Sequence, residues 1–406
     1  MEWKLKDLTV DGKGSYGIGA SAVPYQEDKL TYLRITDIND DGSLNFSDLK
    51  SVDAEDAEKY ILKENDIVFA RTGNSTGRSY FYEKQHGTFV YAGFLIKFSL
   101  DPNKVNPRIL KYYTHSKPYY DWVSSFDTGA TRGNINAKTY GDMEIELPSR
   151  KIQNRIVSIL SSLDRKIELN NKINADLEEM AQAIFKNWFV DFEPFKDGKF
   201  VDSELGMIPE GWKVGRADDF YQINIGKTPP RKEHKWFSTN PANKIWVSIA
   251  NMGNSGVFIS DSSEYLTKEA VDSHNIIMVP RNTILLSFKL TVGRVAIADK
   301  ELTTNEAIAR FILSDDKYME YLYLYLKNFD YNSLGSTSSI ATAVNSKTIK
   351  GMQMLQPSDK IIDAFHIQVN PIFEKIRSLT KENSRLSLLR DTLLPRLMSG
   401  ELEVPE

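Results

Sequence analysis

The sequence predicts an α+β protein that contains one structural unit twice, as two β-rich domains that are each followed by a long helix, with the two helices packed on each other. The first observation is an internal repeat: residues 148–152 recur as 357–361, and residues 135–139 recur as 344–348. Both matches have an offset of 209 residues, far longer than the roughly 20–50 residues of a solenoid repeat. The second observation is that each copy ends in a long stretch whose apolar residues have helical spacing. A duplicated domain with pseudo-twofold symmetry accounts for both.

The N-terminal part of each copy, residues 1–150 and residues 212–357, is the expected β-rich domain. Short apolar runs bounded by Gly, Asn and Ser are typical of strands that loops connect. Longer amphipathic segments in the same regions indicate a few helices. The expected strands are 66–70, 94–98, 283–287 and 307–311, and the expected helices lie near 108–116 and 316–329.

Two further matches link these domains. Trp3-Lys4-Leu5 resembles Trp212-Lys213-Val214 at an offset of 209, and Gly77-Arg78 resembles Gly293-Arg294 at an offset of 216. The change in offset indicates insertions within the copies. We therefore expect the two domains to share a fold and to differ mainly in their loops.

The C-terminal part of each copy, residues 151–194 and residues 358–406, is the expected helical region. Its apolar residues follow each other in alternating steps of three and four, which is the spacing of a heptad seam. Asn174 and Asn383 occupy the same seam position, where a polar residue typically fixes the register of paired helices. Two independent helices, each packed on its own domain, are the alternative. The residues expected to pair the helices are Ile156, Leu160, Leu163, Ile167, Asn174, Leu177, Ile184, Phe365, Val369, Ile372, Ile376, Asn383, Leu386 and Leu393.

Residues 195–211 join the two copies. This segment carries aromatic, apolar and charged residues and is not rich in Gly and Ser, so it differs from a flexible linker. We expect a connector that is partly ordered.

The composition limits the possible functions. The 406 residues contain no Cys, which excludes disulfides, thiolate metal sites and Cys nucleophiles and favours a cytoplasmic protein. No apolar run is long enough to span a membrane, and the five His residues lack metal-ligand spacing. The 51 Lys and Arg against 55 Asp and Glu give a net charge of −4, which at first disfavours nucleic acid as a partner.

The charge is unevenly distributed, which weakens that first conclusion. The stretch 37–66 alone carries ten acidic residues against three basic ones. Outside it, the first domain has an excess of basic groups. The chain as a whole still lacks the charge to hold DNA tightly by itself, so other subunits would have to supply much of the contact with phosphate.

The sequence contains no recognisable catalytic motif. Gly226-Lys227-Thr228 resembles the end of a phosphate-binding loop, but Tyr221 stands where that motif requires Gly. Pro229 and Pro230 also prevent a helix from starting directly after it. We therefore expect no enzymatic activity in this chain, and no cofactor or metal bound to it.

Polar and basic loops occur at corresponding places in both copies. Arginine, lysine, asparagine and hydroxyl side chains are the types that read base edges and bind phosphate groups. A solvated turn is the alternative for each loop taken alone. Arg78 and Arg294 are the foremost candidates for reading bases. The full set of candidate DNA-binding residues is Lys13, Ser15, Tyr16, Arg71, Thr72, Asn74, Ser75, Arg78, Arg132, Asn134, Asn136, Lys138, Lys227, Thr228, Arg231, Lys232, Lys289, Thr291, Arg294, Ser336, Ser338, Asn345 and Lys347.

Taken together, these features resemble the specificity subunit of a type I restriction–modification system. The resemblance extends over essentially the whole chain and rests on the order of its parts. The motifs are Gly226-Lys227-Thr228-Pro229, the connector from Asp202 to Trp212 and the tail from Ser399 to Val404. The first copy departs from the pattern, because Gly12-Lys13-Gly14-Ser15 stands in place of the Gly-x-Thr-Pro element.

The resemblance implies a DNA-binding subunit without catalytic activity. Each β-rich domain would be a target recognition domain that reads one half of a bipartite site in double-stranded DNA. The pair of long helices would pack antiparallel in a coiled-coil-like manner, separate the two domains and dock two methyltransferase subunits. Restriction–translocase subunits would join through the complex. S-adenosylmethionine, ATP and Mg would be bound by those partner subunits. A scaffold that joins other proteins without reading DNA is the alternative.

Overall fold

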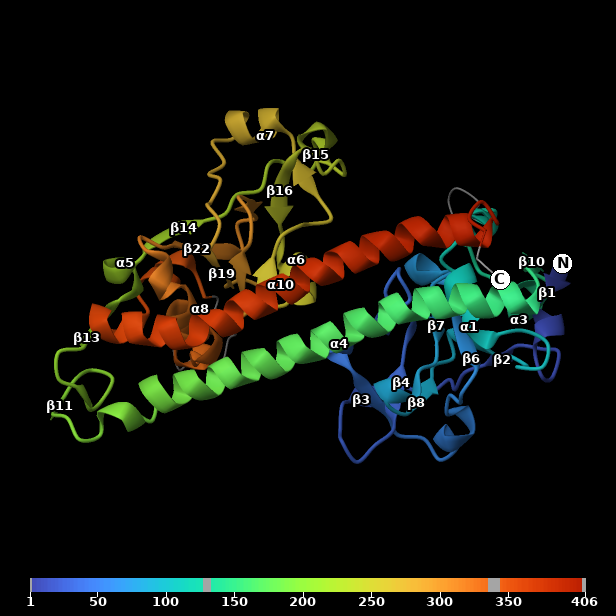
Figure 1. Ribbon diagram of the computed structural model, residues 1–406, viewed down its shortest axis with the longest axis horizontal. Helices are drawn as coiled ribbons and strands as arrows, with labels where there is room; N and C mark the ends of the chain where they lie inside the picture. The colour runs from blue at the N-terminus through green and yellow to red at the C-terminus, as the bar shows by residue number, and fades with distance from the viewer. Residues whose placement is uncertain (1, 127–132, 335–343, 404–406) are drawn as a thin grey trace. The chain divides into compact units, whose positions relative to one another are not determined.

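The computed structural model describes residues 2–126, 133–334 and 344–403 (Figure 1). The chain divides into a first unit, Met1–Ile167 with Ser384–Glu406, and a second unit, Glu168–Asn383. Two 40-residue helices, α4 (Arg150–Phe189) and α10 (Asp359–Met398), each contribute to both units. The predicted α+β architecture, with one β-rich domain and one pair of helix segments in each unit, is confirmed.

The β-rich domain of the first unit contains two four-stranded sheets, with strand orders β2-β9-β6-β7 and β3-β5-β4-β8. Strands β1 and β10 pair antiparallel and bring the two ends of the domain together. Short helices cover the sheets. The bounds are β1 Glu2–Lys4, β2 Ser15–Tyr16, β3 Ala22–Pro24, β4 Thr31–Leu33, β5 Lys50–Val52, β6 Asp66–Ala70, β7 Ser79–Phe81, β8 Phe89–Tyr91, β9 Leu95–Ser99, β10 Glu144–Glu146, α1 Pro107–Tyr113, α2 Lys117–Ser124 and α3 Ala137–Gly141.

The second unit repeats this plan with one more strand. Its sheets have strand orders β14-β22-β19-β20-β17 and β15-β18-β16-β21, and β13 pairs with β23 where the domain begins and ends. The bounds are β13 Lys213–Arg216, β14 Gln222–Ile225, β15 Phe237–Ser238, β16 Lys244–Val247, β17 Phe258–Ile259, β18 Tyr265–Leu266, β19 Ile284–Ser287, β20 Val295–Ala298, β21 Thr303–Thr304, β22 Ile308–Ile312, β23 Gln353–Gln356, α5 Ala217–Phe220, α6 Ile249–Asn254, α7 Lys268–Ser273, α8 Met319–Asn328 and α9 Ser346–Lys350.

The registers of the strands show which residues of the two copies are equivalent. Ala70 lies opposite Leu95 in the β6–β9 pair, as Ser287 lies opposite Ile308 in the β19–β22 pair. The turns that follow β6 and β19 match as well, because Gly77 and Gly293 have φ values of +87° and +90°. Glycine tolerates these positive values without a steric penalty. The predicted match of Gly77-Arg78 with Gly293-Arg294 is confirmed.

The predicted match of Trp3 with Trp212 is wrong by three residues. The Lys4 amide donates to the Asp7 carboxylate, just as the Arg216 amide donates to Asp219, so Lys4 is the equivalent of Arg216. Trp212 has a different role, because its ring lies 5.1 Å from the ring of Phe195 in an aromatic cluster at the end of α4. The two similar tripeptides therefore do not occupy equivalent positions in the two domains.

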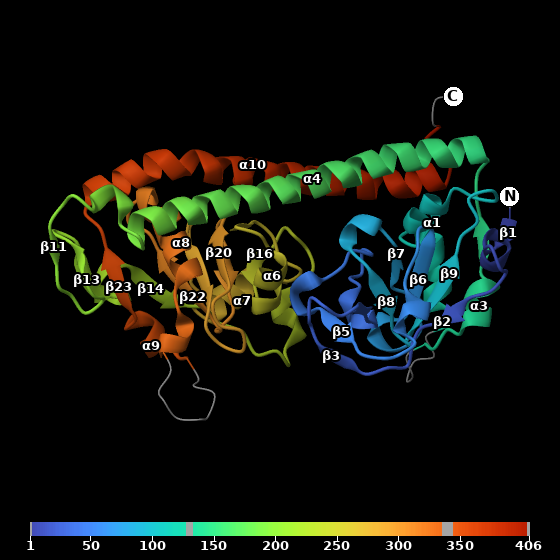
Figure 2. The same cartoon turned by 90° about the horizontal axis from the view of Figure 1, so that it is seen from below.

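The two long helices pack antiparallel in each unit (Figure 2). In the first unit Asp164 of α4 forms an ion pair of 3.1 Å with Arg390 of α10. In the second unit the ring of Trp188 lies 5.7 Å from that of Phe365. The apolar seam thus runs along both helices, and every residue expected to pair them is buried or partly buried.

A layer of amide side chains interrupts this seam in the second unit. Asn170 is fully buried and donates to Asn383 at 2.8 Å, while Asn383 donates to Asn171 at 2.7 Å. Asn174 donates to Thr380 at 3.4 Å. Asn174 and Asn383 therefore do not bond each other, and Asn170 is the central member of the layer. Such hydrogen bonds form in one register only, which gives the pairing its specificity.

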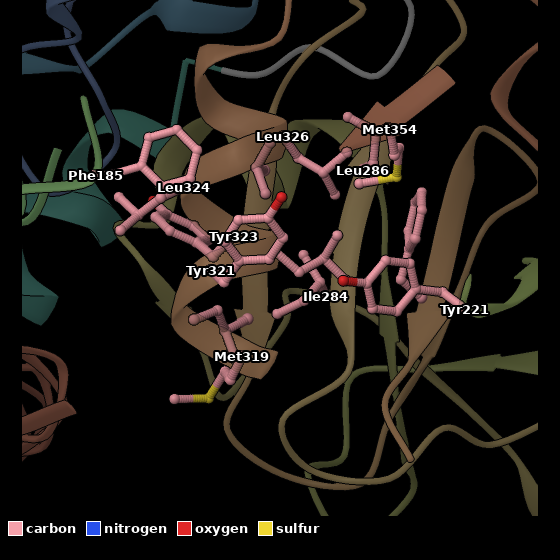
Figure 3. Packing of buried hydrophobic residues seen from close by; sticks show 14 of the residues in the cluster. Phe185, Tyr221, Ile284, Leu286, Met319, Tyr321, Tyr323, Leu324, Leu326 and Met354 are labelled. Carbon is pink, nitrogen blue, oxygen red and sulfur yellow. The ribbon is translucent and has the colours of Figure 1, made fainter. Parts of the chain in front are cut away.

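The core of the second unit joins the helices to the sheets. Figure 3 shows Tyr321 and Tyr323 of α8 packed near Ile284 of β19, with Phe185 of α4 close by. Tyr321 and Ile284 are fully buried. Because this core includes residues of α4, α8, α10 and the five-stranded sheet, the helices are structural parts of the domain and do not form a detached stalk.

The connector forms an ordered hairpin. Strands β11 (Phe200–Val201) and β12 (Ile208–Pro209) pair antiparallel, and Ile208 is buried. Phe192 and Phe195 contact the ring of Trp212. The connector is thus more ordered than its composition indicated, because its aromatic side chains complete the core at the end of α4.

The buried imidazole of His115 should make the stability of the first unit depend on pH. Its imidazole packs against Gly42 and shares a hydrogen bond of 3.1 Å with the Tyr120 hydroxyl. Burial lowers the pKa of His115 from 6.5 to about 4, and the positive charges of Arg390 and Lys111 act in the same direction. Between these values the unfolded chain binds a proton that the folded chain excludes. The full contribution is therefore present above pH 6.5 and is lost as the pH falls towards 4.

We expect the free energy of unfolding of the first unit to fall by about 1–3 kcal/mol between pH 6.5 and pH 4 because of this group. Urea unfolding at a series of pH values measures the slope. The His115→Gln variant, which does not titrate in this range, should show a smaller slope. Identical slopes in the two proteins would show that another group is responsible.

Candidate DNA interface

The candidate interface of each domain begins at a glycine that directly follows a strand, Gly17 after β2 and Gly226 after β14. Gly17 donates to Leu95 and Gly226 donates to Ile308, both at 3.1 Å. A Cβ atom would lie 2.2 Å from a backbone oxygen at Gly17 and 1.9 Å from one at Gly226. Gly17 is therefore the counterpart of Gly226. The expectation that Gly12-Lys13-Gly14-Ser15 replaces the Gly-x-Thr-Pro element is wrong, since Gly17-Ile18-Gly19 occupies that place.

Three of the predicted loops meet in the first unit. The Tyr16 hydroxyl accepts a hydrogen bond of 3.1 Å from the amide of Ala137. The Ile135 amide donates to the Arg71 carbonyl at 3.0 Å. Thr76 donates through its hydroxyl to the Gly133 carbonyl at 2.8 Å. Segments distant in the sequence thus form one continuous surface.

Arg71 is the central cation of this surface. Its guanidinium lies 5.0 Å from the centre of the Tyr16 ring, a cation–π distance. The Nε atom is buried without a hydrogen-bond partner, and no ion pair joins Arg71 to a residue that the structure describes. Tyr16 is 42% exposed and Arg71 is partly exposed, although its Nε atom is buried. This is a positive group with hydrogen-bonding capacity still available to a ligand.

Arg78 and Arg294 have structural partners instead. Arg78 donates to the Asp40 carboxylate at 2.7 Å and to the Ile38 carbonyl at 3.0 Å. Arg294 donates to the Ile249 carbonyl at 2.8 Å. Arg78 therefore holds the segment that follows β4, and Arg294 holds the segment that follows β16. The proposal that they read bases stays untested, but their geometry is that of tethers.

Two predicted asparagines cap helices. The Asn136 side chain accepts from the amide of Thr139 at the start of α3. The Asn345 side chain accepts from the amides of Lys347 and Thr348 at the start of α9. These bonds satisfy amides that a helix N-terminus leaves free. They also fix the exposed Lys138 and Lys347 in the first turns of the two helices.

In the second unit the Gly-Lys-Thr-Pro loop lies against Glu306. Thr228 donates through its hydroxyl to the Glu306 carboxylate, and Lys227 donates to the His274 carbonyl at 2.5 Å. Burial raises the pKa of Glu306, but the hydrogen bond from Thr228 and the positive charges of Lys289 and Arg231 outweigh it and lower the pKa overall. The loop 226–231 and the loop around Lys289 are therefore neighbours.

Arg231 in this loop is held by acidic and aromatic groups. It forms two hydrogen bonds with Glu264, at 2.7 and 3.0 Å. Its guanidinium also lies 4.3 Å from the Phe237 ring centre and 4.5 Å from that of Trp246. The side chain is half exposed, so one edge of a fixed cation faces solvent.

The remaining candidates differ in exposure. Ser75 is buried, and Ser15 shares a hydrogen bond of 3.0 Å with the Tyr91 hydroxyl. Thr72 is partly buried. Arg132, Ser336 and Ser338 lie outside the described residues. The exposed candidates are Lys13, Asn74, Asn134, Lys232, Lys289 and Thr291.

The sequence did not reveal the role of Arg310. This arginine of β22 is 1% exposed and donates to the carbonyls of Ile225 and Ile277, each at 2.8 Å. Burial lowers the pKa of Arg310 to about 10. By binding the Ile225 carbonyl it fixes the residue directly before the Gly-Lys-Thr-Pro loop. A charged residue inside an otherwise apolar strand was the signal that could have identified it.

The family comparison agrees with this arrangement. The model of the type I restriction modification DNA specificity domain matches residues 6–179 and again residues 209–366. The chain belongs to this family. One match falls on each copy of the repeat, and each includes most of one β-rich domain and part of the long helix that follows it.

Two curated specificity subunits resemble this one along most of their length. The HindI specificity subunit of Haemophilus influenzae is 27% identical over 408 residues, covering 85% of this chain and 88% of that protein. The MjaIX specificity subunit of Methanocaldococcus jannaschii is 31% identical over 307 residues, covering 73% and 69%. The S subunit structure from M. genitalium has a TM-score of 0.53 at 14% identity and covers all of this chain and 96% of that one, which supports the fold.

As a specificity subunit, the chain is a non-catalytic component of a restriction–modification system. Within the described ranges no group of His, Asp and Glu side chains could hold a metal ion. Among the same residues, none of the helices is long and apolar enough to cross a membrane.

Proposed function

We propose that this specificity subunit recognises a bipartite sequence in double-stranded DNA, with one half-site bound by each β-rich domain. The observation that carries the proposal is the loop surface of the first unit, where Arg71 lies over the ring of Tyr16 without a described acidic partner. A guanidinium presents paired donors that match the acceptors of guanine or of a phosphate group. Polar side chains of Asn74, Asn134 and Asn136 surround the same loops.

The corresponding surface of the second unit has different chemistry. Phe288 takes the position of Arg71 in the strand register and is buried, while the next residue, Lys289, is exposed. Lys227, Arg231 and Lys232 add positive charge beside it. Since the two domains offer different side chains on equivalent loops, we infer that they read different half-sites.

The subunit would act within a larger assembly. With a net charge of −4 it has little capacity to hold phosphates alone, so partner subunits would supply much of the electrostatic attraction.

Because the helical region is duplicated, we infer two equivalent docking surfaces and hence two methyltransferase subunits. The methyltransferase subunits would bind S-adenosylmethionine, and restriction–translocase subunits would bind ATP and Mg. The assembly would act in the cytoplasm, the compartment that contains its DNA. Native mass spectrometry of the purified complex measures the ratio, and a one-to-one ratio would contradict it.

Arg71→Ala should weaken binding of target DNA by about 1–3 kcal/mol, or roughly five- to 150-fold, if the side chain reads a base. The measurement is a titration of the complex with methyltransferase subunits against a target duplex and a scrambled duplex at one stated salt concentration. Loss of discrimination between the two duplexes indicates base reading. An equal loss on both indicates contact with phosphate.

Lys117→Ala is the matched control, because Lys117 is an exposed cation of the first unit that lies on α2 and pairs with Asp121. Its removal changes the net charge as Arg71→Ala does, and we expect the affinity to stay unchanged. A scaffold without DNA readout would bind both duplexes equally before any substitution is made. That result would reject the proposed function.

A further inference from the structure

The loop that follows β19 presents an unusually exposed leucine. Leu290 is 99% exposed and has a φ of +62°, a value that non-glycine residues rarely adopt. The Thr291 amide donates to the Lys289 carbonyl at 2.7 Å, so Leu290 is the central residue of a tight three-residue turn. Both features are unfavourable for the isolated protein, which makes a function for this side chain the economical explanation.

The base of the loop is held in place by hydrogen bonds. The Ser287 hydroxyl donates to the Thr291 carbonyl at 2.6 Å and accepts from the Arg294 amide at 3.0 Å. The Gly293 amide donates to the Ser287 carbonyl at 3.0 Å. The guanidinium of Arg294 anchors the far end of the loop on Ile249. Leu290 is therefore at the tip of a supported turn.

The surroundings indicate which partner would cover the side chain. Lys289 precedes Leu290 and is exposed, and its charge acts on Glu306 together with that of Arg231. The equivalent loop of the first unit carries Arg71. A positive neighbourhood favours a polyanion. In this loop only Val292, which is 37% exposed, adds apolar surface to Leu290, so the loop lacks the broad apolar patch that a protein interface has.

We propose that Leu290 is an apolar wedge that inserts between two adjacent base pairs of the half-site bound by the second unit. The reason is geometric: none of the residues that the structure describes covers the side chain, which is 99% exposed, and a base step covers both of its faces. Contact with a thymine methyl group at the edge of the groove would cover one face only. Apolar wedges of this kind unstack a base step and kink the duplex, and Lys289 would bind the adjacent phosphate. The proposal rests on the proposed function.

The experiment uses the complex with methyltransferase subunits and duplexes of the target found by methylation mapping. Each duplex carries 2-aminopurine at one position of the second half-site, because the fluorescence of this base rises when it is unstacked. We expect a rise at one step with the wild-type chain. Leu290→Asn should abolish the rise and lower the affinity about tenfold. Asparagine tolerates the positive φ, so the turn is preserved.

Two variants serve as controls. Leu205→Ala removes a half-exposed leucine from the connector hairpin and should change neither signal. Leu290→Met keeps a long apolar side chain and should retain most of the fluorescence rise.

The possible outcomes separate the two proposals. If the wild-type chain binds the target without a rise at any step, the wedge is rejected while the proposed function stands. If replacing a thymine by uracil lowers the affinity for the wild type but not for Leu290→Asn, with no rise, Leu290 reads a methyl group and the wedge is rejected. If the wild-type complex does not distinguish the target from a scrambled duplex, the proposed function itself fails.

Discussion

Asp299→Ala is expected to destabilise the second unit by about 3–5 kcal/mol, because the buried Arg377 loses its buried carboxylate and keeps only the half-exposed Glu374, 3.2 Å away, as an anionic partner. Asp299 and Arg377 are each 3% exposed at their side chains, and they form an ion pair of 2.8 Å between the end of β20 and helix α10. Arg377 also donates to Asn282 at 2.8 Å, and its guanidinium lies 4.3 Å from the Phe258 ring centre. Without Asp299 the buried cation keeps only partial compensation.

Chemical unfolding followed by hydrogen exchange measures this effect and locates it. Increased exchange should be confined to peptides of Glu168–Asn383. Glu301→Ala is the matched control, because Glu301 is exposed and forms only a long surface ion pair with Lys244, at 3.8 Å. Such pairs contribute little, so stability should hardly change. The double variant Asp299→Leu with Arg377→Met should be more stable than Asp299→Ala. An equal loss in Glu301→Ala would contradict the assignment.

Gly226→Ala and Gly17→Ala are expected to have the second large effect. In both, the new methyl group would overlap a backbone oxygen, that of Asn305 or that of Tyr91. Backbone atoms cannot move aside as the end of a flexible side chain can. We expect destabilisation at the upper end of the roughly 1–3 kcal/mol seen for overpacking, together with displacement of the adjacent loop.

The matched controls are Gly19→Ala and Gly256→Ala. Neither glycine has an atom within 4 Å of the added carbon, and neither has a positive φ, so both variants should retain wild-type stability. Thermal unfolding and DNA titration of all four variants test the prediction. If Gly17→Ala is as stable as Gly19→Ala, then Gly17 does not require the absence of a side chain as Gly226 does, although the two occupy equivalent positions.

The sequence predicted the regular elements well because their patterns are local. The strand predicted at 66–70 matches β6, and the heptad spacing predicted long helices that begin and end within a few residues of the predicted seam. Equivalent residues of the two copies could also be identified from the sequence where a turn requires glycine, as at Gly77 and Gly293. These features depend on neighbouring residues in the chain.

The candidate site was less predictable because its properties depend on distant partners. Arg71 and Arg78 look alike in the sequence, yet Arg78 meets Asp40 from the acidic stretch, whereas Arg71 stacks on Tyr16. Asn136 and Asn345 were assigned to DNA, although an asparagine directly before a short helix is also a capping signal. Nothing in the sequence distinguished Leu290 from an ordinary loop residue, since exposure and φ exist only in the folded chain.

Because each long helix contributes to both units, the first unit can be completed only after α10 has been synthesised. The first unit contains residues from both ends of the chain, and its core includes Ile156 and Leu160 together with Leu394 and Leu397. When the ribosome has made the first domain and α4, the core around Ile156 and Leu160 still lacks Leu394 and Leu397, so this face stays incompletely covered until α10 emerges. A prematurely terminated chain would therefore expose this face, where proteases and chaperones can detect it. Only a chain that includes Leu394 and Leu397 would escape this selection and assemble with other subunits.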